Sequence, residues 1–86
     1  DRRLAALPAG DRPPPREAFV LRNYALRRRL LEDPGRIEQV LAAYVAAGPQ
    51  GATEAAIAAA TRLPVAVVAR VSLWLLKYHY LKVSDP

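Results

Sequence analysis

Several residue types on which proteins build chemical sites are missing or scarce in this chain. Its 86 residues include no cysteine and no methionine, and only one histidine, His79. The absence of cysteine excludes a disulfide framework and a thiolate metal site, and a single histidine cannot build a metal site alone. The core must therefore be purely hydrophobic, and we expect neither a metal nor another cofactor.

Long apolar runs are also missing. No uninterrupted apolar stretch approaches the roughly 18 residues of a membrane span, and no charged-then-apolar signal segment opens the chain. We therefore expect a soluble, cytoplasmic protein with no membrane partner. The chain begins with Asp1 rather than Met, which predicts a piece of a longer protein. With 86 residues it is near the lower size at which one domain is stable alone, so a partner would add to its stability.

Patterns that carry catalysis are absent as well. The sequence has no Gly-rich phosphate loop, no cysteine nucleophile and no metal-ligand spacing. Ser72 and Ser84 have only His79 as a base, and nothing completes a triad. We expect that this chain is not an enzyme.

Acidic residues are fewer than basic ones, and the surplus of positive charge is uneven. The chain has 13 Lys and Arg against 8 Asp and Glu, a net charge of +5. Residues 1–36 hold nine Arg against five acids, a net of +4, whereas residues 37–86 hold four Lys or Arg against three acids, a net of +1. This balance favours an anionic partner such as DNA, although an Arg- and Ala-rich composition also follows from a GC-rich genome.

Proline is concentrated at the start of the chain. Four of the eight prolines lie within residues 1–15, so we expect an extended arm or linker there, with no more than a turn at 4–7. Arg2, Arg3 and Arg12 on such an arm can reach a minor groove, but a disordered tail is the simpler interpretation. The remaining residues, 16–86, are expected to form the domain.

Two amphipathic helices are predicted next. The first helix, over residues 16–31, has a broad apolar face with arginines beside it, and Asp33-Pro34-Gly35 ends it. The second helix, over residues 36–47, has the clearest helical spacing of apolar residues in the chain. The first helix can dock on the core and turn guanidinium groups toward phosphates, although a solvated helix face predicts the same pattern. The arginines assigned to phosphate contact are Arg22, Arg27, Arg28 and Arg29.

The most informative stretch, residues 53–79, predicts helix, three-residue turn, helix. Thr53 is a plausible N-cap, and Arg62-Leu63-Pro64 interrupts the apolar pattern. Pro64 sets the start of the second helix because its missing N–H would be unpaired there in any case. The row facing the core is then Val68, Val71 and Leu75. Ala52 predicts a very short strand before this unit, and residues 80–84 alternate like a half-buried strand after it.

The sequence from the first of these helices onward resembles a known family of proteins. A small residue, an Ile-Ala pair, a Leu-Pro turn, a spaced Val and a closing Tyr-Leu occur here as Ala56, Ile57-Ala58, Leu63-Pro64, Val68 and Tyr80-Leu81. The pattern resembles the winged-helix transcriptional regulators of the MarR and IclR type over roughly the last 50 residues. The resemblance implies a mostly α, winged-helix-like helix-turn-helix bundle with an N-terminal extra helix and at most short strands. It also implies DNA binding in transcription or replication control. A wing needs a turn and a returning strand, and neither follows residue 84, so either sequence outside this chain supplies the wing or the domain is wingless.

The second helix of this unit presents few polar side chains for reading bases. Among its exposed first turns only Arg70 can hold guanine bidentately, while Ala66 and Val67 are limited to thymine methyl groups. Lys77 and Lys82 are placed near phosphates. We therefore expect affinity to come mainly from phosphate contacts.

The same helix is apolar on nearly every side, which supports a second hypothesis. Leu73, Trp74 and Leu76 fall outside the core row. Either the helix at 16–31 covers them, or they form a homodimer contact or dock to a larger protein complex. Core filling is the favoured role for Trp74.

Overall fold

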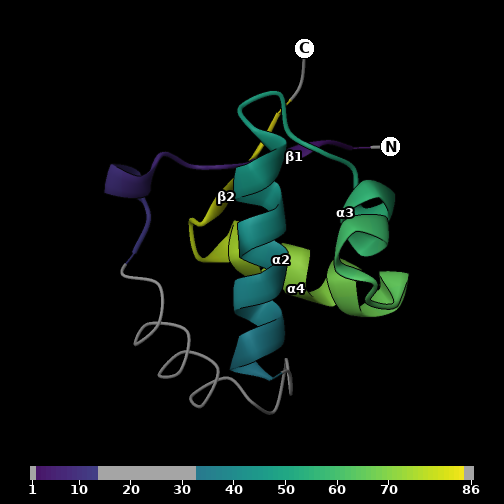
Figure 1. Cartoon of the computed structure of the whole chain (residues 1–86). Helices are drawn as coiled ribbons and strands as arrows, with labels where there is room; N and C mark the ends of the chain where they lie inside the picture. The colour runs from purple at the N-terminus through teal and green to yellow at the C-terminus, as the bar shows by residue number, and fades with distance from the viewer. Residues whose placement is uncertain (1, 14–32, 85–86) are drawn as a thin grey trace.

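The protein is described from a computed structural model that covers residues 2–13 and 33–84. The order of elements is β1 (Leu4–Ala6), the single 3-10 turn η1 (Ala9–Asp11), α2 (Pro34–Ala47), α3 (Glu54–Thr61), α4 (Val65–Lys77) and β2 (Leu81–Val83). Figure 1 shows α2 and α4 crossing, α3 to one side, and the two strands near the C-terminal end of α2. The fold is mostly helical with only short strands, as predicted, and two of these strands pair as a small antiparallel sheet. The helix predicted at 16–31 lies outside the described residues.

Helix α2 begins two residues earlier than the sequence pattern predicted. Asp33 is its N-cap, and its carboxylate accepts a hydrogen bond of 2.9 Å from the amide of Gly35. Pro34 occupies the first turn, where no partner for its nitrogen is needed. The start predicted at about Arg36 is therefore corrected to Pro34, because Asp33-Pro34-Gly35 itself forms the start of this helix.

The helix pair at 53–79 was predicted correctly in its limits. Thr53 caps α3 by accepting a hydrogen bond of 3.2 Å from the amide of Ala56. The C-cap of α3 is Arg62, which has a left-handed backbone (φ 61°). Its amide donates a hydrogen bond of 2.8 Å to the carbonyl of Ala58. Pro64 precedes α4, and the chain is bent by 116° between the two helices. An angle of this size lies within the range typical of helix-turn-helix units.

Strand β1 forms a two-stranded sheet with β2 and has a single isolated bridge on its other side. It pairs antiparallel with β2 in the register Leu4 to Val83, Ala5 to Lys82 and Ala6 to Leu81. On its other side Leu4 exchanges two backbone hydrogen bonds, of 2.8 and 2.9 Å, with Ala52. The predicted short strand at Ala52 is therefore present as a single bridge. The partner strand of β2 comes from the N-terminal end of the chain.

This pairing corrects the prediction of an arm or linker over residues 1–15. Leu4 and Ala5 have only 1% and 0% of their surface exposed. A strand of three residues is too short for its alternation to be seen in the sequence, and two of the three residues are alanine, a poor strand former. The partners that bury β1 lie nearly 50 and 80 residues further along the chain.

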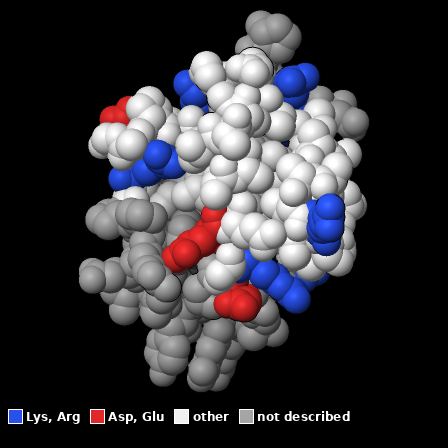
Figure 2. Space-filling view, in the orientation of Figure 1, with Lys and Arg blue, Asp and Glu red and all other residues white. Residues whose placement is uncertain are grey.

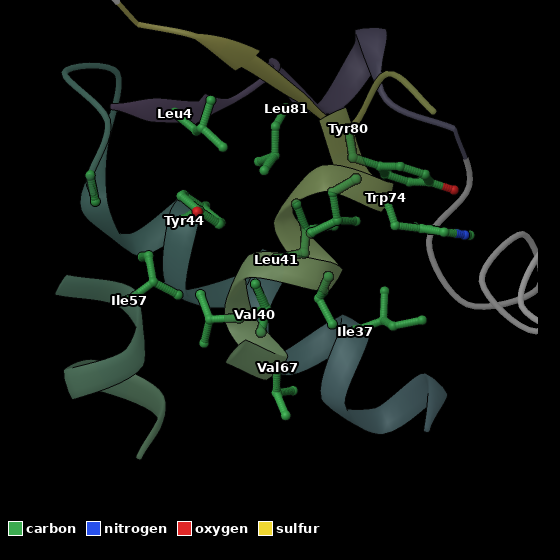
Figure 3. Packing of buried hydrophobic residues seen from close by; sticks show 14 residues of the cluster. Leu4, Ile37, Val40, Leu41, Tyr44, Ile57, Val67, Trp74, Tyr80 and Leu81 are labelled. Atoms are coloured by element: carbon green, nitrogen blue, oxygen red, sulfur yellow. The ribbon is translucent and has the colours of Figure 1, made fainter. Parts of the chain in front are cut away.

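The core lies between the helices and the sheet (Figure 3). The predicted row Val68, Val71 and Leu75 is fully buried, which confirms that part of the pattern. Tyr44 is also buried, and its hydroxyl forms a hydrogen bond of 2.7 Å with that of Ser72. Burial raises the pKa of Tyr44 above its ordinary value because the phenolate would lose its hydration, an effect only partly offset by the hydrogen bond. The other members of the buried apolar cluster include Leu4, Ile37, Val40, Leu41, Ile57, Tyr80 and Leu81.

Candidate nucleic-acid interface

One face of α4 is turned to solvent. Ala66, Arg70, Leu73 and Lys77 are all exposed and follow one another at spacings of four, three and four residues. This spacing places them in one stripe along the helix. Val65 borders the stripe at the first turn and is 55% exposed. The outward stripe of α4 thus alternates small or apolar side chains with two cations.

Val67 does not belong to this stripe, although it was predicted to contact bases. Its side chain is only 7% exposed and lies in the buried cluster, as Figure 3 shows. The physical reason is that α2 and α3 both pack on α4, so the buried face of α4 is wider than one row of residues. Val67 is a core residue, and its assignment to base contact was wrong.

The three residues predicted to contact a protein partner also differ in how far they are buried. Leu73 is 60% exposed, Leu76 is half-buried and Trp74 is 6% exposed. The indole of Trp74 stacks on the ring of Tyr80, with ring centroids 6.0 Å apart and planes at 16° (Figure 3). Trp74 therefore fills the core, and among these three residues only Leu73 presents most of its side chain to a partner.

The cations near α4 come from different positions. Arg70 and Lys77 lie on the outward stripe, and the Lys77 ammonium is 5.8 Å from the centroid of the Tyr78 ring. Arg62 is exposed at the turn between α3 and α4. Sequence reasoning placed Arg62 in the turn but did not count it as a contact residue. The position of this cation in the turn of a helix-turn-helix could have indicated a phosphate contact.

Lys82 is placed apart from this stripe. It is exposed on β2 and borders a hollow whose described walls come from the chain after β1, η1 and the C-terminal part of α2. Arg22, Arg27, Arg28 and Arg29 lie outside the described residues. Arg3 is held in place, because its guanidinium donates a hydrogen bond of 3.2 Å to the carbonyl of Gly51.

The charged residues in the sequence from Ala55 to Ser84 are all of one sign. No aspartate or glutamate occurs between Ala55 and Ser84, a span that holds Arg62, Arg70, Lys77 and Lys82. Figure 2 shows Lys and Arg at separate places around the visible face, with acidic side chains between them, so no single basic patch covers that view. The positive charge near α4 is therefore carried by separate side chains and not by one continuous basic patch on the visible face.

The described residues offer neither a metal site nor a membrane-spanning helix. Within residues 2–13 and 33–84, no group of three His, Asp or Glu side chains is arranged to hold a metal ion. No single helix there has both the length and the apolar composition to cross a membrane; α3 and α4 meet that test only together, and they are bent by 116°. Comparison of the chain with protein-family models, curated proteins and solved structures found no match.

Proposed function

We propose that this chain is a winged-helix-like, nucleic-acid-binding module, in which α4 enters the major groove of duplex DNA. The observation that carries the proposal is the outward stripe of α4, with Arg70 and Lys77 on the second helix of a pair bent by 116°. Helix pairs of this geometry place their second helix in the groove. A role in transcription or replication control, in the cytoplasm, follows from the resemblance described above.

The stripe supports a particular kind of binding. Arg70 and Lys77 are seven residues apart, which is about 10 Å along a helix axis, close to the width of about 12 Å of the major groove. The two cations can therefore reach toward opposite groove walls. Between and beside them, Ala66 and Leu73 offer only apolar contact. Binding is then driven by phosphate contacts and discriminates weakly between base sequences.

The test is a salt series. The chain is titrated into a labelled DNA duplex of random sequence, and fluorescence anisotropy gives the dissociation constant at each salt concentration. We expect the double variant Arg70→Gln, Lys77→Gln to bind more weakly and to lower the log–log salt slope by about 1.8, since each phosphate contact contributes about 0.9. Arg36→Gln, at an exposed arginine on α2, is the control for losing one positive charge away from α4. A wild-type chain that does not bind at low salt overturns the proposal, as does a double variant that binds like the control.

A second function is supported by one observation, the exposure of Leu73 and Val65 on α4, at 60% and 55%. Two large apolar side chains on an outward helix suit a contact with a second copy or with another protein of a larger complex. Leu73→Asp should then separate subunits in sedimentation velocity while the far-UV circular dichroism stays unchanged. A wild-type chain that sediments as a monomer at high concentration counts against the homodimer form.

A further inference from the structure

A hollow with two cations at its edge lies away from α4. Its volume is about 300 Å³, and its described walls come from the chain between β1 and η1, the C-terminal part of α2, the turn after α2, and β2. Figure 1 shows the chain leaving β1, passing α2 and reaching η1 on that side of the molecule. Arg12 and Lys82 border the hollow from two different elements, and none of its described lining residues is acidic. Its apolar walls include Leu7, Tyr44, Val45 and Pro49.

Arg12 is the unusual member of this set. Its Nε atom is covered and finds no hydrogen-bond acceptor, although its side chain is only half-buried. Buried donors are nearly always paired, and a charged donor without an acceptor is costly. The same side chain also borders a second hollow of about 160 Å³, beside Leu41. The neighbouring Asp11 is exposed and does not border either hollow.

We propose that this hollow binds a small organic anion, with its carboxylate or phosphate group between Arg12 and Lys82 and its apolar group against Val45 and Pro49. Arginine and lysine form their strongest hydrogen bonds with such anions. The volume is at the lower end of the range for ligand pockets, and a dry cavity of about 150 Å³ already holds benzene. The ligand is therefore of about the size of a single ring with one acidic group. Because no described residue of α4 borders the hollow, this site is separate from the proposed DNA contact.

The test uses benzoate, phenyl phosphate, benzyl alcohol and inorganic phosphate as probes of the full chain, followed by the backbone amide signals in NMR. We expect saturable binding of one or both aromatic anions, with shifts concentrated at Leu7, Ala9, Gly48 and Lys82. The relative affinities of benzoate and phenyl phosphate identify the acidic group. Benzyl alcohol, which lacks the charge, and inorganic phosphate, which lacks the ring, should each bind at least about tenfold more weakly. Equal binding of benzyl alcohol, or shifts spread over α4 instead, would overturn the proposal.

Two variants test whether the cations at the edge of the hollow bind the acidic group of the ligand. Lys82→Gln and Arg12→Gln should each weaken binding of the aromatic anion by about tenfold, the loss expected for one charge-assisted hydrogen bond. Lys82 is exposed, so that variant tests the site without disturbing the core, whereas Arg12→Gln is checked for folding by circular dichroism. Lys77→Gln on α4 is the matched control. If Lys77→Gln weakens binding as much as Lys82→Gln, the effect is one of net charge and the site does not exist.

Discussion

Two basic residues with left-handed backbone stand at the two ends of α4. Arg62 has a φ of 61° and His79 a φ of 68°, and within the described residues they are the non-glycine positions with positive φ. This conformation costs an L-residue about 1–2 kcal/mol, and glycine is the usual choice after a helix. The turn between α3 and α4 therefore carries a cation at the expense of some stability.

Replacing Arg62 tests this balance. We expect Arg62→Gly to raise the free energy of unfolding by about 1 kcal/mol, because glycine adopts the left-handed conformation without strain. The same variant should weaken DNA binding if α4 and its turn contact the phosphates. Arg62→Gln removes the charge and keeps the strain, so it should weaken binding without a gain in stability. Urea denaturation and anisotropy measure the two effects, and a loss of stability in Arg62→Gly contradicts this account.

Gly51 is required where the chain turns back to the sheet. Its φ is +77°, and a Cβ atom there would lie 2.6 Å from the carbonyl oxygen of Leu4 and 3.0 Å from Cβ of Ser84. Gly51→Ala should therefore lower the free energy of unfolding by at least about 2 kcal/mol, since neither the backbone nor the pairing can move freely. Gly10→Ala is the control, because no atom lies within 4 Å of its Cβ position. Equal midpoints for the two variants in thermal unfolding would count against the tight turn.

Tyr44 makes stability depend on pH in the alkaline range. Its pKa is raised above 10.0 by burial, so the folded chain keeps this proton where the unfolded chain loses it. The contribution is complete below pH 10 and is lost as the pH rises through the folded pKa. Tyr44→Phe should show a smaller fall in the free energy of unfolding between pH 9 and 11 than the wild type. At pH 7 the variant should be less stable by about 1 kcal/mol because Ser72 loses its partner. Parallel pH profiles for the two proteins would refute the assignment.

At the scale of elements, local signals carried the correct predictions. Thr53 as a cap and Pro64 as a helix start act through neighbours within four residues, so the pair α3 and α4 is encoded where it forms. The outward stripe containing Arg70 follows from the same helical spacing. The start of α2 at Pro34 was also encoded locally, but an Asp-Pro-Gly triplet in a sequence is compatible with a helix end as well as with a helix start.

What the sequence could not predict depends on contacts between distant residues. Strand β1 exists because Ala52 and β2 lie on its two sides, and nothing within residues 1–13 indicates those partners. Val67 is buried because two helices cover α4, which a single core row does not predict. The hollow at Arg12 and Lys82 likewise depends on residues that are far apart in the sequence.

Strand β1 can be tested as part of the core. We expect Leu4→Ala to lower the free energy of unfolding by about 2–4 kcal/mol, the cost of removing a fully buried leucine side chain. Leu73→Ala removes the same atoms from a side chain that is 60% exposed, and should change stability by less than about 0.5 kcal/mol. Chemical denaturation of both variants compares them directly. An arm that is not part of the fold would give Leu4→Ala no effect.

At the scale of the whole molecule, the net charge of +5 is divided between the N-terminal arginines and the part from α3 onward. Phosphate contacts add along a DNA backbone, so both parts should contribute to a salt-dependent affinity. Substituting Arg27, Arg28 and Arg29 together with alanine should lower the salt slope by up to about 2.7, against about 1.8 for the α4 double variant.

Combining the two sets separates the contributions. If both contact phosphates independently, the five-site variant should show the sum of the two slope changes and should lose measurable binding at 150 mM salt. A triple variant with the wild-type slope would place the DNA contact on the α4 side alone. A double variant with the wild-type slope, beside a weakened triple variant, would place it on the N-terminal side.

The antiparallel pairing of β1 with β2 also determines how the protein responds to a mechanical load. The amide of Ser84 donates a hydrogen bond of 2.9 Å to the carbonyl of Arg3, and both residues lie at the same end of the antiparallel strand pair. Force applied between these two residues acts along the inter-strand hydrogen bonds, which lie perpendicular to the strands. The bonds then open one after another, as in a zip, instead of sharing the load. We therefore expect the sheet to yield before the helix pair, so that a pull between Arg3 and Ser84 releases β1 from the core while α3 and α4 are still folded.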